Sequence, residues 1–154
     1  SDFTPINELI IDKGEFISNG ESFKLSPVRA SLLRYLIEKR LNSKCENKCK
    51  GCIKCFVSMN EFSDQYGKRI FQHHISVSGE MNGHIDNIKD LRKGFADTFS
   101  IQTNIRSDLS RIKSDIKRKG ISNNFKNSIT FTTKRIDGTK YYGINIPKNI
   151  IRFK

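Results

Sequence analysis

The chain lacks the sequence features of a membrane or secreted protein. No run of about 18 or more apolar residues is present, so no stretch qualifies as a transmembrane helix. The amino terminus shows no signal-peptide pattern. Internal repeats and low-complexity stretches are also absent, which argues against a repeat architecture. We therefore expect a soluble, cytoplasmic protein with no membrane partner.

Acidic residues are scarce relative to basic ones. Asp and Glu total 16 against 28 Lys and Arg, which gives a net charge of +12 on 154 residues. This excess is typical of a phosphate binder, and RNA or an acidic protein would also fit it. The length suits one domain, and a hydrophobic content of 36% with eleven Phe is enough for a core. The chain begins with Ser1, not Met, so we expect it to be a fragment of a longer protein.

The segment Ile101–Gly120 has a clear helical pattern. Apolar residues recur at the i, i+4, i+8 and i+11 spacing of an amphipathic helix, at Ile101, Ile105, Leu109, Ile112 and Ile116. The other faces carry short polar side chains and cations that suit the base edges and phosphates of a major groove about 12 Å wide. These candidate DNA-contacting residues are Thr103, Arg106, Ser107, Ser110, Arg111, Lys113, Ser114, Lys117 and Arg118.

The same helix face has a simpler explanation. Arg111 with Asp115, and Asp115 with Lys119, are spaced to form i, i+4 ion pairs on a solvated surface. The helix alone does not separate this explanation from DNA binding.

A predicted β-hairpin follows. Ser128–Ile136 and Thr139–Ile146 are rich in Ile, Phe, Thr and Tyr, and Asp137-Gly138 between them is typical of a two-residue type I′ turn. Three cations lie near this turn and join the candidate DNA-binding set: Lys134, Arg135 and Lys140. A hairpin with a basic tip, placed after a groove-binding helix, is typical of the wing of a winged helix-turn-helix.

The amino-terminal part predicts strands followed by two capped helices. The strands are expected at 8–11, 15–18 and 22–25, with an Asn19-Gly20 turn after the second. Ser26 and Pro27 provide an N-cap and a first helical residue for a helix that continues to about Arg40. Ser58 and Glu61 form a capping-box pattern that begins a second helix ending near Gly67.

All four cysteines of the chain lie in one short segment, at Cys45, Cys49, Cys52 and Cys55. Four thiolates with such short spacers can surround one ion tetrahedrally at Zn–S distances of about 2.3 Å. We therefore predict a single structural, non-catalytic Zn²⁺. An iron–sulfur cluster is the alternative, and it would make the protein a redox-sensing regulator. Free thiols or disulfides are a further alternative, although a cytoplasmic location disfavours disulfides.

Taken in order, these motifs resemble the winged-helix output domain of bacterial response regulators of the OmpR type. GEFISNGESFKLSPVRASLLRYLIEKR, residues 14–40, is similar to the family's first hairpin, its Leu-Ser/Thr-Pro turn and its first helix. Leu109–Lys113 is similar to the recognition-helix pattern Ile-Ser-Arg-Leu-Arg, and Tyr141–Ile144 lies where the family has Gly-Tyr-Arg-Leu. The resemblance covers residues 14–41 and 98–146.

The resemblance implies sequence-specific binding of double-stranded DNA, with the third helix in the major groove and the wing on the neighbouring groove. It also implies a bacterial transcription regulator with an N-terminal sensor domain in the full-length protein, and it is compatible with a homodimer. The insertions are departures from the family's pattern.

We therefore predict a single α+β winged helix-turn-helix domain over residues 1–154, with no enzymatic activity. Its expected parts are N-terminal strands (1–25), a first helix (26–41), a four-cysteine insertion (42–57), a second helix (58–67), an insertion with an extra helix at Ile85–Phe95 (68–97), a recognition helix (98–120) and a wing (128–146).

Two other functions are alternatives. The region 71–91 faintly resembles the core of HNH nucleases, in which His73 or His74 at a strand end would be the general base and Asn87 would orient water. The second cysteine pair and the later His of such nucleases are missing. Winged helices also serve as protein–protein interaction modules, in which a basic face only aids solubility.

Overall fold

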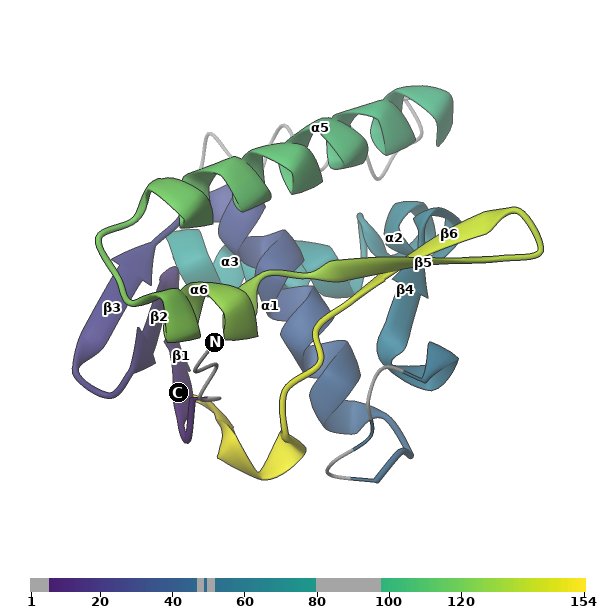
Figure 1. Ribbon diagram of the computed structural model, residues 1–154. Helices are drawn as coiled ribbons and strands as arrows, with labels where there is room; N and C mark the ends of the chain where they lie inside the picture. Colours follow the sequence, from purple (N-terminus) through teal and green to yellow (C-terminus); the bar gives the residue numbers. More distant parts are fainter. Residues whose placement is uncertain (1–5, 47–48, 50–51, 80–97) are drawn as a thin grey trace.

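The computed structural model describes residues 6–46, 49, 52–79 and 98–154 (Figure 1). Within this part the chain forms five α-helices and two small sheets, which confirms the predicted α+β class. The helices are α1 (Pro27–Asn42), α2 (Met59–Gln65), α3 (Arg69–Ser78), α5 (Thr98–Arg118) and α6 (Asn123–Ile129). The strands are β1 (Leu9–Asp12), β2 (Glu15–Ser18), β3 (Glu21–Lys24), β4 (Phe56–Ser58), β5 (Thr132–Ile136), β6 (Thr139–Gly143) and β7 (Ile151–Phe153).

The first sheet has the strand order β3-β2-β1-β7. β1 pairs antiparallel with β2 and parallel with β7, so both ends of the described chain meet in one sheet. Asn19 and Gly20 have φ values of 50° and 81°, the left-handed conformation that an Asn-Gly turn between β2 and β3 requires. Strand β7 was not predicted, because three residues are too few to show an alternating pattern.

Helix α1 runs through the middle of the molecule and is buried on most sides (Figure 1). Apolar residues from Ala30 to Ile37 contact α3, α5 and the second sheet, which together surround the helix. Phe62 of α2 packs against Tyr35 of α1 and Tyr142 of β6, with ring centroids 6.0 and 5.8 Å apart. This shared core fixes α2, α5 and the second sheet relative to one another.

The second sheet has the order β4-β6-β5, and β5 and β6 form the predicted hairpin. Asp137 and Gly138 have φ values of 51° and 79°, as a type I′ turn requires. β4 pairs only with the base of β6, where Phe56 faces Gly143 and Ser58 faces Tyr141. The tip of the hairpin therefore projects beyond β4 (Figure 1).

The boundaries of the predicted wing and insertions need correction. Residues 128–131 do not belong to a strand, since α6 extends to Ile129 and β5 begins at Thr132. The Ser122 hydroxyl accepts a hydrogen bond from Phe125 N at 3.2 Å and caps α6, while Phe125 and Ile129 are buried. Residues 56–57, assigned to the cysteine insertion, belong to β4. α3 was not predicted, and the predicted helix Ile85–Phe95 lies outside the described residues.

Alanine at Gly143 is expected to destabilise the second sheet. A Cβ atom there would lie 2.5 Å from the Phe56 ring, so the ring and β4 must move. Overpacking of this kind costs about 1–3 kcal/mol in the free energy of unfolding. Gly120→Ala is the matched control, because nothing lies within 4 Å of a Cβ at that position. Urea denaturation of both variants measures the difference, and equal midpoints would contradict the expected role of the Phe56–Gly143 contact.

Candidate metal centre and nucleic-acid interface

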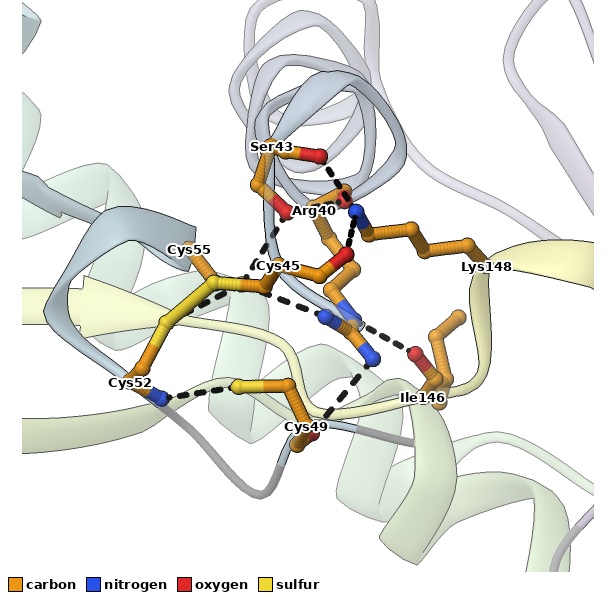
Figure 2. Close-up of a disulfide and its surroundings, with 8 residues drawn as sticks. All are labelled: Arg40, Ser43, Cys45, Cys49, Cys52, Cys55, Ile146 and Lys148. Carbon is orange, nitrogen blue, oxygen red and sulfur yellow. Dashed lines mark hydrogen bonds between the residues drawn. A yellow bond between two sulfur atoms is a disulfide. The ribbon is translucent and has the colours of Figure 1, made fainter. Parts of the chain in front are cut away.

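The four cysteines converge at the carboxyl end of α1 (Figure 2). Their sulfur atoms all lie within 4.8 Å of one another, and Cys52 Sγ is 3.9 Å from Cys55 Sγ. Cys55 is buried and the other three are partly exposed. The backbone N–H of Cys52 donates to Cys49 Sγ at 3.3 Å, so one sulfur already accepts a main-chain hydrogen bond. This group could hold a metal ion, as the spacing predicts.

Cys45 and Cys52 are joined as a disulfide in the structure (Figure 2). Their Cα atoms are 7.6 Å apart, which is beyond the usual range of about 4.4–6.8 Å for a disulfide. In a tetrahedral site with Zn–S bonds of about 2.3 Å, sulfur atoms are instead separated by about 3.8 Å. The Cα separation and the convergence of Cys49 and Cys55 on the same point therefore favour four ligands around one ion.

A buried arginine connects this cluster to the rest of the fold. Arg40, in the last turn of α1, is only 1% exposed. Its Nη1 donates to Cys55 Sγ at 3.2 Å, its Nη2 donates to the Cys49 carbonyl at 3.4 Å and its Nε donates to the Ile146 carbonyl at 2.6 Å. A guanidinium beside thiolate sulfur stabilises negative charge there. Sequence reasoning missed Arg40, since nothing in the sequence distinguishes it from the other cations of α1.

Four of the five residues of the predicted apolar stripe of α5 are buried, and the fifth, Ile101, is partly buried against the core. Ile105, Leu109, Ile112 and Ile116 are at most 2% exposed. The nine predicted DNA-contacting residues of this helix are all exposed: Thr103, Arg106, Ser107, Ser110, Arg111, Lys113, Ser114, Lys117 and Arg118. The three predicted hairpin cations, Lys134, Arg135 and Lys140, are exposed as well.

The two acidic residues of α5 face α1. Arg29 of α1 donates from Nη1 to Asp115 at 2.7 Å, and its Nε lies 3.8 Å from Asp108. Burial raises the pKa of Asp108, while the charges of Arg29 and Arg111 act in the opposite direction. No ion pair joins Asp115 to Arg111 or Lys119 among the described side chains, in contrast to the predicted intrahelical pairs. The exposed face of α5 is therefore cationic.

α5 and the hairpin meet along a groove. Residues of α2, α5 and the hairpin line it: Met59, Asn60, Gln102, Arg106, Arg135, Gly138, Thr139, Lys140 and Tyr142. Arg106 and Arg135 both lie close enough to Tyr142 to lower its pKa against the larger, raising effect of burial. Gln102 Nε2 donates to Asn60 Oδ1 and Ser63 Oγ, both at 3.2 Å, which fixes the start of α5 on α2. The groove thus places three cations beside two amide side chains.

The candidate lysines differ in their contacts. Lys113 Nζ lies 4.6 Å from the centre of the Phe131 ring, and Lys134 Nζ lies 5.2 Å from that of Phe56. Lys140 Nζ lies 5.4 Å from the Tyr142 ring. These cation–π contacts hold the ammonium groups at the junction of α5, β4 and the hairpin while leaving the side chains exposed.

The histidines of the nuclease hypothesis do not lie at a strand end. His73 and His74 are on α3 and are each 2% exposed. His73 Nδ1 accepts from Arg34 Nε at 3.0 Å, and His73 Nε2 lies 3.1 Å from Glu38 Oε1. Asn87 lies outside the described residues. The ββα arrangement that would expose either His as a base is therefore absent around these two residues.

Comparison with protein families, with curated proteins and with solved structures finds no match to this chain. In the described part of the chain, no helix combines the length and apolar character needed to cross a lipid bilayer. The function is therefore inferred from the geometry of the cysteine cluster and of the groove between α5 and the hairpin.

Proposed function

We propose that the chain is a winged-helix module that binds double-stranded DNA as part of a transcription regulator, with a structural zinc ion in the cysteine cluster. α5 is its recognition helix and the β5–β6 hairpin is its wing. The groove between α5 and the hairpin is the observation that carries this proposal. Arg106, Arg135 and Lys140 line it, and none of the described lining residues is acidic.

The electrostatics of α5 support DNA as the partner. Its acids are directed to Arg29 of α1, so its short polar side chains and cations are left to face outward. A phosphate backbone attracts such a face, and short side chains between the cations allow close approach to base edges. The net charge of +12 also favours attraction to the phosphate backbone.

The order of elements supports a winged helix. The elements that match a winged helix occur along the chain in the order α1, β4, α2, α5 and the β5–β6 hairpin. β4 joins the hairpin to make a three-stranded sheet. α5 precedes the hairpin, and both lie against the core made by α1 and α2. α3 and α6 are additions to this order. Docking α5 in a major groove would bring the hairpin tip toward the neighbouring phosphates.

Zinc fits the cysteine cluster better than an iron–sulfur cluster does. Four sulfurs within 4.8 Å of one another leave room for a single tetrahedral ion. A four-iron cluster would place its whole inorganic core between the same sulfurs and would spread them further apart. All four cysteines would be ligands, so no position remains for substrate and the ion is structural. Elemental analysis and a visible spectrum of the purified protein distinguish zinc from iron.

Substitutions in α5 and in the hairpin are expected to weaken DNA binding in different ways. Arg106→Ala or Arg111→Ala should cost about 1–3 kcal/mol at the preferred sequence, if the lost contact is bidentate to guanine. Arg135→Ala should weaken all duplexes alike and lower the slope of log K against log salt by about 1. Fluorescence anisotropy with a pool of random duplexes and a selected site, at several salt concentrations, measures both effects.

Arg152→Ala is the matched control. Arg152 is exposed on β7 in the first sheet, and it is not among the residues that line the groove. The variant Arg152→Ala removes the same charge as Arg135→Ala does, but from outside the groove. It should therefore leave duplex affinity nearly unchanged. If Arg152→Ala weakened binding as much as Arg135→Ala did, the attraction would be nonspecific and the groove would not be the interface.

If no duplex bound at any salt concentration, the interaction-module alternative would replace the proposal. Nicking of a duplex in added Mg²⁺ or Mn²⁺ would favour the nuclease alternative.

A further inference from the structure

The cysteine cluster lies at the base of the hairpin, not on a separate part of the surface. Cys55 is followed directly by β4, and β4 pairs with β6 at Phe56–Gly143, Val57–Tyr142 and Ser58–Tyr141. The Phe56 ring covers Gly143 so closely that a Cβ atom there would clash. The same ring lies under Lys134 of β5. The residues that follow the fourth cysteine therefore hold both strands of the hairpin.

Two side chains connect the cluster to the segment that leaves the hairpin. Arg40 donates to Cys55 Sγ and to the Cys49 carbonyl, and its Nε donates to the carbonyl of Ile146, three residues beyond β6 (Figure 2). Lys148 Nζ donates to the carbonyls of Ser43 and Cys45. The segment that precedes the hairpin in the chain is thus connected to the cluster through β4. The segment that follows the hairpin is connected to it through Ile146 and Lys148.

The attachment through Arg40 should depend on whether an ion holds the four sulfurs together. Four thiolates around a divalent ion carry a net charge of about −2, which complements a guanidinium that is 1% exposed. Without an ion, reduced cysteines have no crosslink that holds their four sulfurs together, so Cys49 and Cys55, which accept hydrogen bonds from Arg40, are fixed less firmly.

α5 does not share this dependence. Its buried stripe packs in the core that surrounds α1, and its ion pairs run to Arg29, near the opposite end of α1 from Arg40. Loss of the ion should therefore change the hairpin while α5 stays in place.

We propose that the ion bound by the four cysteines sets the position of the β5–β6 hairpin, through Arg40 and β4, so that metal occupancy regulates DNA affinity. The regulatory part rests on the proposed DNA-binding function. The structural part, which is the effect of the metal on the hairpin, is independent of it.

Hydrogen–deuterium exchange of the full chain, with and without Zn²⁺ under reducing conditions, tests the structural part. Removal of Zn²⁺ with a chelator should speed amide exchange in β4 and β6 and leave the centre of α5 protected. Zn²⁺ added back should restore the protection. Equal exchange of the hairpin in the two states, or equal loss of protection in the hairpin and α5, would overturn the proposal.

DNA affinity tests the regulatory part. The zinc-free protein should bind a pool of random duplexes about tenfold more weakly than the zinc-loaded protein, which corresponds to about 1.4 kcal/mol. If the zinc-loaded protein binds duplexes and the zinc-free protein binds them equally well, regulation by the metal is wrong and DNA binding stands. If neither form binds, the proposed function fails, and the exchange experiment still decides whether the metal positions the hairpin.

Arg40→Met separates the connection from the ion itself. This variant should still bind one Co²⁺ with a tetrahedral thiolate spectrum, but its hairpin should exchange faster even when metal is bound. Lys39→Met is the matched control, because Lys39 is the preceding residue and bonds to Glu61 instead of the cluster. Should Arg40→Met fail to fold, Lys148→Met removes the second connection from a partly exposed position. A hairpin as protected in both Arg40→Met and Lys148→Met as in Lys39→Met would contradict the proposed connection.

Discussion

Serine in place of Cys55 is expected to abolish tight metal binding and to lower the free energy of unfolding by more than about 3 kcal/mol. Cys55 is the one buried cysteine of the four, and its sulfur accepts a hydrogen bond from the buried Arg40. A serine hydroxyl would leave the guanidinium beside a neutral group. Changes outside the ligand set of a metal site cost about 10–100-fold in affinity, so loss of a ligand should cost more than about 100-fold. Competition with a chromophoric chelator and thermal unfolding measure the two effects.

Serine substitutions at each of the four cysteines, compared with one another, distinguish a metal site from a disulfide. If an ion holds the cluster, serine at Cys49 or Cys55 should be as harmful to metal binding as serine at Cys45 or Cys52, because each supplies one of four ligands. If the Cys45–Cys52 disulfide holds it, only those two substitutions should matter and a reductant should mimic them. Insensitivity of stability to chelators, together with sensitivity to reductant, would reject the metal site.

Ser43→Ala is the control for this series. Ser43 Oγ lies 3.2 Å from Cys55 Sγ and donates to the Arg40 carbonyl at 2.9 Å, so it touches the cluster without being a ligand. The variant should still bind one ion per chain. A loss of metal as large as that of Cys55→Ser would mean that the cluster responds to any local change, and the assignment of Cys55 as a ligand would lose its support.

The sequence predicts those parts of the fold that depend on local pattern. The stripe from Ile105 to Ile116 has helical spacing over several turns, so the helix and its buried face follow from the sequence. Asp137-Gly138 specifies a turn through backbone conformation alone. The short spacers between the four cysteines keep them in one segment and indicate a shared site, and the fold brings their sulfurs together as that spacing predicts.

Features that depend on distant contacts were not predictable in this way. β7 is a strand only because β1 offers it a parallel partner more than a hundred residues earlier. Residues 128–131 alternate polar and apolar side chains like a strand, yet Ser128 and Ile129 end α6, which the Ser122 hydroxyl caps and whose Phe125 is buried. Arg40 looks like any other cation of α1, and only the fold shows that it contacts Cys55 and the Ile146 carbonyl.

A partly buried ionic network between α1 and α3 is a further feature that depends on distant contacts. Arg69 of α3 donates to Glu38 of α1 from both Nε, at 2.7 Å, and Nη2. His73 Nδ1 accepts from Arg34 Nε, so the proton on its Nε2 is available to Glu38 Oε1 at 3.1 Å. Burial acts to raise the pKa of Glu38, but the hydrogen bonds from Arg69 and His73 outweigh burial and lower this pKa to about 2. The carboxylate form of Glu38 therefore stabilises the contact between the two helices.

Alanine in place of Glu38 is expected to lower the free energy of unfolding at neutral pH by about 2–3 kcal/mol, less than the loss of a fully buried pair, because Glu38 is 15% and Arg69 46% exposed. The folded-state pKa lies below the ordinary 4.5, so this stabilisation is complete above pH 4.5 and is lost as the pH falls through about 2. With Arg69 46% exposed and screened by solvent, the pH-dependent part should be about 2 kcal/mol. Denaturant unfolding of wild type and of Glu38→Ala, between neutral and acidic pH, measures how the difference between their free energies of unfolding narrows.

Asp64→Ala, which breaks the exposed pair with Lys68, should cost little free energy of unfolding at any pH. A difference between wild type and Glu38→Ala that stayed constant down to pH 2 would show that Glu38 contributes by packing and not by its charge.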